Sequence, residues 1–286
     1  MIGKTNSVSG ISENKLDYVV KDNIEYELTA SDTQNWTSIK DYTFRKSTKL
    51  TRVVANNVTS IGDAAFMYCT SLTSVSLPNC TSIISDLVFT GCTNLVSVDL
   101  PLITSIGYEY FRECTKLTTV NFPLVTSIDT MAFFECANLT SLDFPLVTSI
   151  GYGAFMECTK LTTVNLPLVT SIPQEAFERC NNLTTVNIPL VASIDRYGFR
   201  ECGNLTTIDL PSVTKIDQDV FYYCTKLKTM FLRANSVCTL SNTNAFLLVR
   251  GLTIYVPSDL VESYKTATNW STLVSNNQVT FAAISE

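Results

Sequence analysis

Hydrophobic and polar positions along this chain follow a unit of 22 or 23 residues. Residues 139–161 read LTSLDFPLVTSIGYGAFMECTKL, and residues 161–183 keep almost the same order as LTTVNLPLVTSIPQEAFERCNNL. A phenylalanine near the end of the unit returns at intervals of 22, then 23, then 22 residues six times, at Phe44, Phe66, Phe89, Phe111, Phe133, Phe155, Phe177, Phe199 and Phe221. Most of the chain is therefore one structural unit in many copies.

Each copy predicts a strand, a second extended segment and a short helical turn. In the pattern L-x-x-V-x-L the first, fourth and sixth residues are apolar, as in Leu117, Val120 and Phe122. Alternation on a strand then turns the third and fifth residues outward. The proline that follows cannot donate to a sheet, so it ends the strand. We expect an α/β solenoid, a leucine-rich repeat array of 22–23-residue units with a parallel sheet.

The repeat decays at both ends and divides the chain into three regions. Residues 1–35 are expected to form an N-terminal cap or tail, residues 36–250 the leucine-rich repeat solenoid, and residues 251–286 a C-terminal strand–helix cap. Irregular caps are needed because the end coils of a solenoid otherwise expose their core.

Both caps have local signals. Residues 18–20 and the alternating positions within residues 24–28 predict a short strand or hairpin. Residues 252–257, LTIYVP, predict a last strand. Ser258 and Asp259 favour the start of a helix over residues 259–268, since both residue types suit the N-cap and first turn.

Composition excludes several kinds of chemistry. The 286 residues include no histidine, which removes Ser-His-Asp and Cys-His catalysis and imidazole metal ligands. The net charge is −6, with no basic patch or stripe, so we expect no nucleic acid partner. No apolar run approaches the length of a transmembrane segment. We expect no cofactor, and no metal site, because the chain has no C-x-x-C pair and its acidic residues are not grouped.

The ten cysteines do not have the spacing of a disulfide framework. Eight of them follow the core phenylalanine by three residues, at Cys69, Cys92, Cys114, Cys136, Cys158, Cys180, Cys202 and Cys224. Stacked coils turn their Cα–Cβ bonds parallel to one another, a poor geometry for a bridge. We expect reduced cysteines that pack as small apolar residues, with Cys80 also in the core. Pairing among them stays the alternative.

The consensus L-x-x-V-x-L-P-x-V-T-S-I-x-x-x-A-F-x-x-C-x-x-L resembles the BspA-like class of leucine-rich repeats, over about residues 36–275. Residues 252–271, LTIYVPSDLVESYKTATNWS, are similar to the closing segment of such proteins. The resemblance implies a bacterial surface or secreted protein that adheres to host proteins, matrix or other cells, and it brings no catalytic residues. The chain departs from that pattern in having no visible secretory signal in residues 1–15 and no wall-sorting motif at its end.

One candidate ligand-binding face is the outward side of the sheet. The fifth strand position carries Asp99, Asn121, Asp143, Asn165, Asn187, Asp209 and Phe231. Extended sheet faces are where solenoids usually bind. The alternative is a structural ladder, in which these small polar side chains hydrogen-bond to one another between coils.

A second candidate is an aromatic surface beside the expected helical turns. It comprises Tyr68, Tyr108, Tyr110, Tyr152, Tyr197, Tyr222 and Tyr223. Tyrosine is a favoured interface anchor. The alternative is that some of these rings fold over the coil edges and shield the core.

Together the patterns predict a non-enzymatic binding or adhesion module that recognises a protein or glycan through a repeat face. The alternative function is a structural or assembly component, such as a phage-tail-associated protein. No paired carboxylates mark a hydrolase site. The resemblance implies an extracellular or cell-surface location, and the sequence names neither the ligand nor the oligomeric state.

Overall fold

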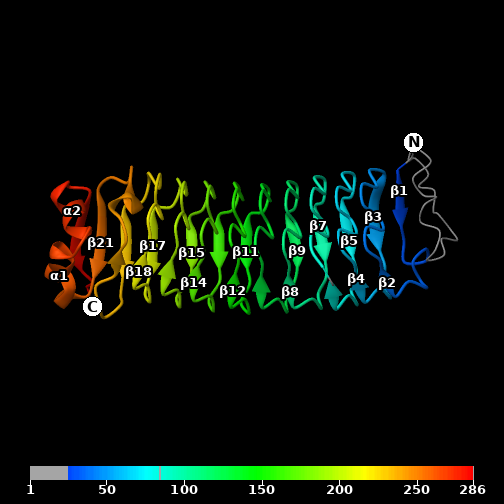
Figure 1. The fold of residues 1–286 in the computed structure, drawn as a ribbon, viewed down its shortest axis with the longest axis horizontal. Coiled ribbons are helices and arrows are strands. Elements are labelled where there is room, and N and C mark those ends of the chain that lie inside the picture. Colours follow the sequence, from blue (N-terminus) through cyan, green and yellow to red (C-terminus); the bar gives the residue numbers. More distant parts are fainter. Residues whose placement is uncertain (1–24, 84, 286) are drawn as a thin grey trace. The chain divides into compact units, whose positions relative to one another are not determined.

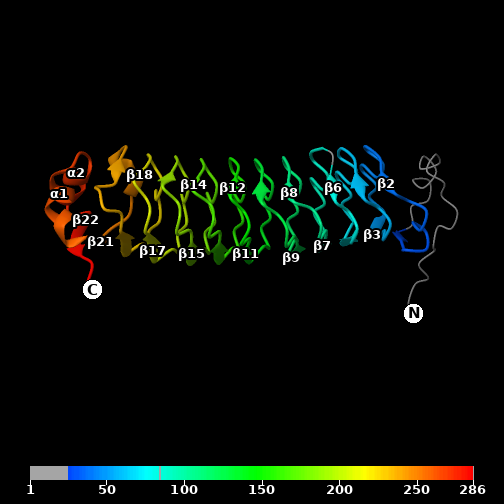
Figure 2. The same ribbon diagram turned by 90° about the horizontal axis from the view of Figure 1, so that it is seen from below.

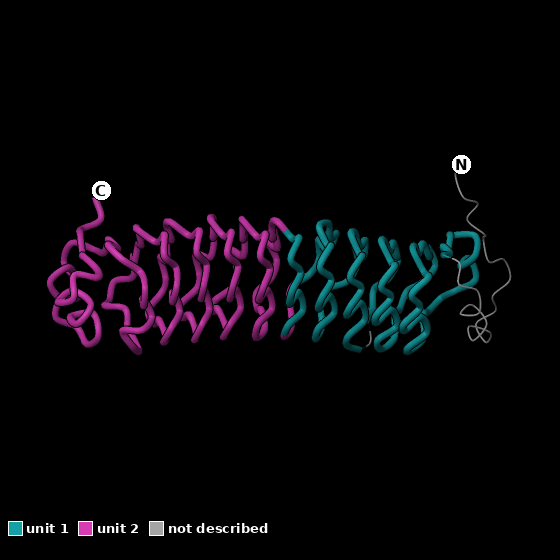
Figure 3. Tube along the Cα trace, turned by 90° about the horizontal axis from the view of Figure 1, so that it is seen from above, with its two compact units in different colours: residues 1–125, 131–139 teal, residues 126–130, 140–286 magenta. Residues whose placement is uncertain are grey.

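The structure, a computed structural model, describes residues 25–83 and 85–285. Its contacts divide the chain into two compact units (Figure 3). Unit 1 comprises residues 1–125 and 131–139, and unit 2 comprises residues 126–130 and 140–286. Both units are stacks of the same coil, which confirms the leucine-rich repeat solenoid.

Unit 1 has two rows of short parallel strands. The first row is one sheet of five neighbouring strands, β1 (Tyr26–Leu28), β3 (Leu50–Val54), β5 (Ser74–Ser76), β7 (Ser97–Asp99) and β9 (Thr119–Asn121). The second row contains β2 (Ser38–Ile39), β4 (Ser60–Ile61), β6 (Ser82–Ile83) and β8 (Ser105–Ile106). Figure 2 shows the two rows on opposite sides of the coils. The strand expected within residues 24–28 is confirmed as β1, while residues 18–20 lie outside the described part.

Unit 2 repeats this plan and carries the C-terminal cap (Figure 1). Its first row consists of β11 (Ser141–Asp143), β13 (Thr163–Asn165) and β15 (Thr185–Asn187), then β17 (Thr207–Leu210), β19 (Thr229–Leu232), β21 (Leu252–Val256) and β22 (Val279–Ala283). Its second row consists of β10 (Ser127–Ile128), β12 (Ser149–Ile150), β14 (Ser171–Ile172), β16 (Ser193–Ile194), β18 (Lys215–Ile216) and β20 (Thr239–Leu240).

The register of the sheets follows the repeat length. Ser141 pairs with Thr163, and Thr163 pairs with Thr185, so each residue lies beside the residue 22 positions later. Equal repeat lengths therefore turn sequence columns into physical columns. The same rule aligns the outward polar positions of the strands in columns on the sheet face and the buried apolar positions in columns inside.

The core phenylalanines form a stack in each unit. Ring centroids from Phe44 to Phe133 are 5.2–5.4 Å apart in unit 1, and those from Phe155 to Phe246 are 5.4–5.7 Å apart in unit 2. All are almost fully buried. Stacked aromatic pairs contribute roughly 0.5–1.5 kcal/mol beyond their burial, so the column joins each coil to the next.

The backbone around each phenylalanine forms tight turns in place of the expected helical turn. In the coil of Phe44, alternate N–H groups donate to carbonyls of the next coil, and those between them close turns within the coil. The pairs between coils are Tyr42–Asp63, Phe44–Ala65 and Lys46–Met67, each 2.8 Å. Residues two before and two after the phenylalanine adopt left-handed φ values, 56° at Tyr42 and 61° at Lys46, and the other coils repeat this. The arrangement satisfies backbone groups that the core would otherwise leave unpaired.

The cysteine column lies inside, as expected. All ten cysteines are buried, and none of them forms a disulfide bond. The Cys92 thiol donates to the Phe66 carbonyl of the preceding coil at 3.0 Å, and the Cys180 thiol donates to the Phe155 carbonyl at 3.2 Å. Burial raises the pKa of these thiols, which keeps them protonated as donors.

The C-terminal cap contains the 3₁₀ segment η3 (Ser258–Leu260) and the helices α1 (Val261–Thr266) and α2 (Trp270–Ser275), and a further 3₁₀ segment, η2 (Thr243–Phe246), lies in the coil before it. The Tyr264 hydroxyl accepts the Cys238 N–H at 2.8 Å, and the Trp270 indole donates to the Cys238 carbonyl at 2.7 Å. Two buried aromatic residues thus fix the cap to one backbone unit. The expected capping is wrong, because neither η3 nor α1 has a side-chain N-cap hydrogen bond and the α-helix begins after Leu260.

Candidate functional site

The fifth strand position faces outward in both units, because the residues on either side of it are buried. In unit 1 the Asp99 carboxylate accepts from the Ser76 hydroxyl at 3.1 Å and from the Asn121 amide at 2.7 Å. In unit 2 the Asn165 amide donates to Asp143 at 2.7 Å, and the Asn187 amide donates to Asn165 at 2.6 Å. These contacts favour the structural-ladder interpretation for Asp99, Asn121, Asp143, Asn165 and Asn187.

Hydroxyl groups reinforce this ladder at the second strand position. The Thr162 hydroxyl donates to the Thr140 carbonyl at 2.9 Å, and the Thr184 hydroxyl donates to the Thr162 carbonyl at 3.1 Å. Because these polar atoms have partners within the protein, the uniform part of the face offers few free groups to a ligand.

The ladder changes character at β17, β19 and β21. The rings of Phe231 and Tyr255 stack there with centroids 5.0 Å apart and an interplanar angle of 21°. The two residues are register partners on neighbouring strands. Both side chains are only partly buried. This is the one place on the sheet face, among the described residues, where two outward aromatic rings lie together.

An arginine covers one side of this aromatic pair. The Arg233 guanidinium lies 4.7 Å from the Phe231 ring centroid. It also forms hydrogen bonds of 2.9–3.1 Å to both carboxylate oxygens of Asp209 on β17. The hydrogen bond to Asp209 raises the pKa of Arg233, so the side chain stays charged while it is held in place. We call Asp209, Phe231, Arg233 and Tyr255 the C-terminal sheet site.

The sequence pattern pointed to Asp209 and Phe231 but missed Arg233 and Tyr255. Arg233 stands where the regular coils have proline, so the repeat pattern gives it no role. Tyr255 belongs to a coil of altered length, in which Phe231 pairs with Tyr255 rather than with a residue 22 positions later. Thr253, Tyr255 and Pro257 match the third, fifth and proline positions of the repeat, and this match could have predicted that Tyr255 faces outward.

The aromatic surface is assembled only in part. Tyr108 and Tyr223 are 39% and 50% exposed, whereas Tyr68, Tyr152, Tyr197 and Tyr222 are partly buried. The prediction that Tyr110 belongs to this surface is wrong, because Tyr110 is 3% exposed and its ring packs edge-on against Phe111. It occupies the small-residue position before the core phenylalanine, and Gly107 leaves room for the ring, since a Cβ there would lie 2.4 Å from it.

Charged residues hold several of these tyrosines in unit 2. Arg200 contacts Glu178 at 3.0 Å and lies 5.0 Å and 5.3 Å from the ring centroids of Tyr197 and Tyr222. Burial raises the pKa of the Glu178 carboxyl, while the charge of Arg200 opposes the rise.

Tyr152 has a similar role in the same unit. Its hydroxyl donates to Glu175, and that hydrogen bond, with burial, raises the pKa of Tyr152 to about 12. Much of the tyrosine surface therefore satisfies its own polar groups.

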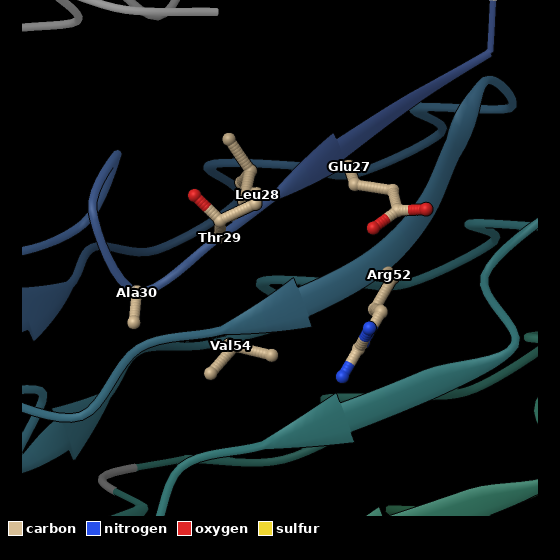
Figure 4. A pocket seen from close by; sticks show the side chains of 6 residues that line it. All are labelled: Glu27, Leu28, Thr29, Ala30, Arg52 and Val54. Atoms are coloured by element: carbon tan, nitrogen blue, oxygen red, sulfur yellow. The ribbon is translucent and has the colours of Figure 1, made fainter. Parts of the chain in front are cut away.

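Unit 1 has a small pocket at the N-terminal end of its sheet. Its volume is about 230 Å³, and it is lined by Glu27, Leu28, Thr29, Ala30, Arg52 and Val54 (Figure 4). Glu27 on β1 is the register partner of Arg52 on β3, and Figure 4 shows both side chains on the same side of the sheet. The pocket offers one acid and one base among small and apolar groups. The sequence did not predict it, because β1 belongs to the irregular cap.

Two features are absent from the described residues. No three His, Cys, Asp or Glu side chains lie close enough together to hold a metal ion. No helix there has the length and apolar character needed to cross a membrane.

Comparison with protein families gives one match. The family described as BspA type leucine rich repeat region matches in six copies, over residues 37–162 and 148–272. None of the curated proteins compared with the chain matches it.

Solved structures share the fold at low sequence identity. A leucine-rich repeat protein from Bacteroides ovatus ATCC 8483 is 20% identical, with a TM-score of 0.53 over 92% of this chain and 84% of its own. One from Eubacterium ventriosum ATCC 27560 is 19% identical, with a TM-score of 0.50 over 82% of this chain and 84% of its own. A leucine rich cell surface protein from Faecalibacterium prausnitzii A2-165 is 22% identical, with a TM-score of 0.38 and 87% of each chain covered.

Proposed function

Since the chain belongs to the BspA-type leucine-rich repeat family, which covers residues 37–162 and 148–272, we propose that it is a binding module without enzymatic activity. Its partner is a protein or a glycan, and the contact is made by the C-terminal sheet site of unit 2. Leucine-rich repeat solenoids serve as scaffolds whose extended faces bind. The family therefore supports a binding role, and we propose that the C-terminal sheet site makes the contact.

The observation that carries this proposal is the stack of Phe231 on Tyr255 on an outward sheet face. The other outward positions of this column carry small polar residues that bond to each other. Aromatic and arginine side chains are the residues most enriched at binding hot spots. A stack fixed in advance by Arg233 and Asp209 loses little side-chain entropy when a partner binds.

The test is a panel of matrix proteins and glycans probed with the protein and a Phe231→Ser/Tyr255→Ser variant. We expect at least a tenfold loss of binding to whichever partner is found. Tyr42→Ser is the matched control, because Tyr42 is an exposed tyrosine of unit 1 outside both candidate faces and its variant should bind as the parent does. A partner bound equally well by all three proteins would place the contact elsewhere, and no partner on the panel would contradict adhesion.

We propose an extracellular or cell-surface location, which the BspA-like kinship favours. Protease treatment of intact cells should then remove the protein, while an internal marker stays intact. Recovery of the intact protein from shaved cells would contradict this location.

The internally bonded ladders favour a second candidate, a structural or assembly component such as a phage-tail-associated protein. Uniform columns such as Asp143–Asn165–Asn187 suit a spacer whose surface need not be recognised by a partner. Copurification with particles, in amounts that the Phe231→Ser/Tyr255→Ser variant leaves unchanged, would favour this role over adhesion.

A further inference from the structure

Phe231 covers one face of the Tyr255 ring, and the ring is only partly buried. Arg233 and Asp209 lie beyond Phe231 on the β17 side. The residue beside Tyr255 on its other flank is its register partner on β22, Ala282. Alanine has no side-chain atom beyond Cβ, so the side chain next to the Tyr255 ring is small, and Ala282 is itself partly exposed. The stack Arg233–Phe231–Tyr255 is thus followed on the sheet face by a small side chain.

Hydroxyl groups border the place above Ala282. Thr253 and Thr280 precede Tyr255 and Ala282 by two residues on β21 and β22, and they are register partners. Since residues two apart on a strand share a face, their side chains are on the same outward side. A ligand above Ala282 would therefore meet a flat aromatic face on one flank and hydroxyl groups at one end. Sugar rings present both an apolar C–H face and a hydroxyl edge.

The local charge is positive, although the chain as a whole carries −6. Residues 220–258 contain no Asp or Glu and four cations, Lys226, Lys228, Arg233 and Arg250. Lys228 directly precedes β19, Arg250 precedes β21 by two residues, and both are exposed. The Lys228 ammonium donates to the Arg250 carbonyl, which is uncharged, so the interaction does not cancel its charge. Arg233 follows β19 at the opposite end of the aromatic pair.

The cations and the stack are within reach of one extended ligand. Lys228 precedes Phe231 by three residues, which is about 10 Å along a strand, and Arg233 follows it by two, about 7 Å. This span suits a short oligosaccharide lying across the strand ends. Arg233 is paired with the Asp209 carboxylate, and within residues 25–83 and 85–285 neither Lys228 nor Arg250 forms an ion pair.

We propose that the place above Ala282 binds one sugar ring of an acidic glycan whose uronate carboxylates are drawn to Lys228, Arg250 and Arg233. The inference rests on the proposed function and deepens it, because it names the ligand class of the C-terminal sheet site. The ring stacks on Tyr255, the Thr253 hydroxyl hydrogen-bonds to its hydroxyl groups, and the Thr280 hydroxyl, which donates to the Leu252 carbonyl at 3.5 Å, accepts a hydrogen bond from them. Charge complementarity selects an acidic over a neutral or cationic glycan.

The test measures binding of an oligogalacturonate and of its methyl ester, which has the same rings without the charges. The parent protein should bind the acidic form at least tenfold more tightly, and this preference should shrink as salt rises. Lys228→Gln/Arg250→Gln should lose most of the preference and keep binding to the ester. Equal affinity for the two forms would overturn the acidic assignment.

A blocking variant tests the place itself. Ala282→Leu keeps Tyr255 but fills the space beside its ring, and it should lower affinity for the oligogalacturonate at least tenfold. Tyr255→Ser should do the same, while Tyr42→Ser should not. Unchanged melting temperatures would show that each variant is folded. Full binding by Ala282→Leu would overturn the inference.

Other probes separate this inference from the proposed function. A neutral glycan or a protein whose binding needs Phe231 and Tyr255 would leave the proposed function standing and overturn the acidic glycan. Stronger binding of poly-glutamate or of a single-stranded oligonucleotide would also overturn it. Failure of every probe on the panel would remove both.

Discussion

At the scale of single residues, the core tolerates little variation because each buried side chain contacts its copies in neighbouring coils. Phe155 is fully buried and stacks on Phe177 with ring centroids 5.4 Å apart. Its backbone carbonyl also accepts the Cys180 thiol. A change at one core position is therefore felt in the next coil as well.

Replacing Phe155 by alanine should lower the free energy of unfolding by about 3–5 kcal/mol, through lost burial and the cavity left behind. Urea denaturation followed by circular dichroism measures it. Leu168→Ala is the control, since Leu168 is 40% exposed and should change stability by no more than about 0.5 kcal/mol. An equal effect of both substitutions would contradict the stacked core.

At the scale of elements, the turn around each phenylalanine is the least expected part of the coil. It needs left-handed backbone at two places, and in the first coil these fall on Tyr42 and Lys46, which are not glycines. Left-handed conformation costs an L-residue roughly 1–2 kcal/mol. Hydrogen bonds between coils hold the backbone there.

Two lysines of one coil allow a matched test. Lys46 has a φ of 61°, while Lys49 is not among the left-handed residues. Lys46→Gly should raise the free energy of unfolding by up to about 1 kcal/mol, because glycine adopts this φ without strain. Lys49→Gly should lower it by about 0.5–1 kcal/mol. Chemical denaturation of both variants decides, and a loss of stability in Lys46→Gly would refute the strain.

The C-terminal cap depends on one buried hydroxyl. Tyr264→Phe leaves the Cys238 N–H without its acceptor, and an unpaired buried donor costs about 1–3 kcal/mol. Thermal unfolding should show a lower melting temperature. Tyr255→Phe removes a hydroxyl from the outward face and should leave it nearly unchanged. A cap as stable with phenylalanine as with tyrosine would mean that another group accepts this N–H.

The elements also show how far the sequence leads. The strands, the phenylalanine stack and the cysteine column follow from a fixed period, because equal spacing forces equal positions into register. The turn geometry was hidden, since residues such as Glu157 and Arg179 carry no sign of left-handed backbone, and only Gly91 and Gly153 hint at it. Tyr110 was predicted to lie on the surface because it is a tyrosine, although its position in the repeat, just before the core phenylalanine, is a buried one. The position of Ala282 beside Tyr255 depends on the pairing of β21 with β22. No repeat pattern encodes that pairing.

At the scale of the whole molecule, stability is close to a sum of coils and of contacts between neighbouring coils. The buried thiols make the free energy of unfolding depend on pH. Burial raises the pKa of Cys80 to about 11 and that of Cys224 to about 12. An unfolded thiol has a pKa of about 8.5. The folded chain therefore holds more protons than the unfolded chain above that pH.

Stability should accordingly be unaffected by the thiols below about pH 8.5 and should fall as the pH rises toward the folded values. The slope is about 1.4 kcal/mol per pH unit for each thiol titrating only in the unfolded state. Urea midpoints at pH 7, 8, 9 and 10 test this. Cys80→Val should reduce the fall, since other coils carry Val125 or Val147 at this position. A flat profile to pH 10 would show that the thiols are not protected.

The constant register between coils has a consequence for the gene. Ser141, Thr163 and Thr185 stack because each coil has the same length, so removing or duplicating one 22-residue coil leaves every remaining pair aligned. In DNA this is a segment of 66 nucleotides, three for each of 22 codons, flanked by near-copies of itself. Such tandem copies recombine out of step, and each product keeps its reading frame. Lineages can thus differ in coil number by single genetic events while both caps stay intact.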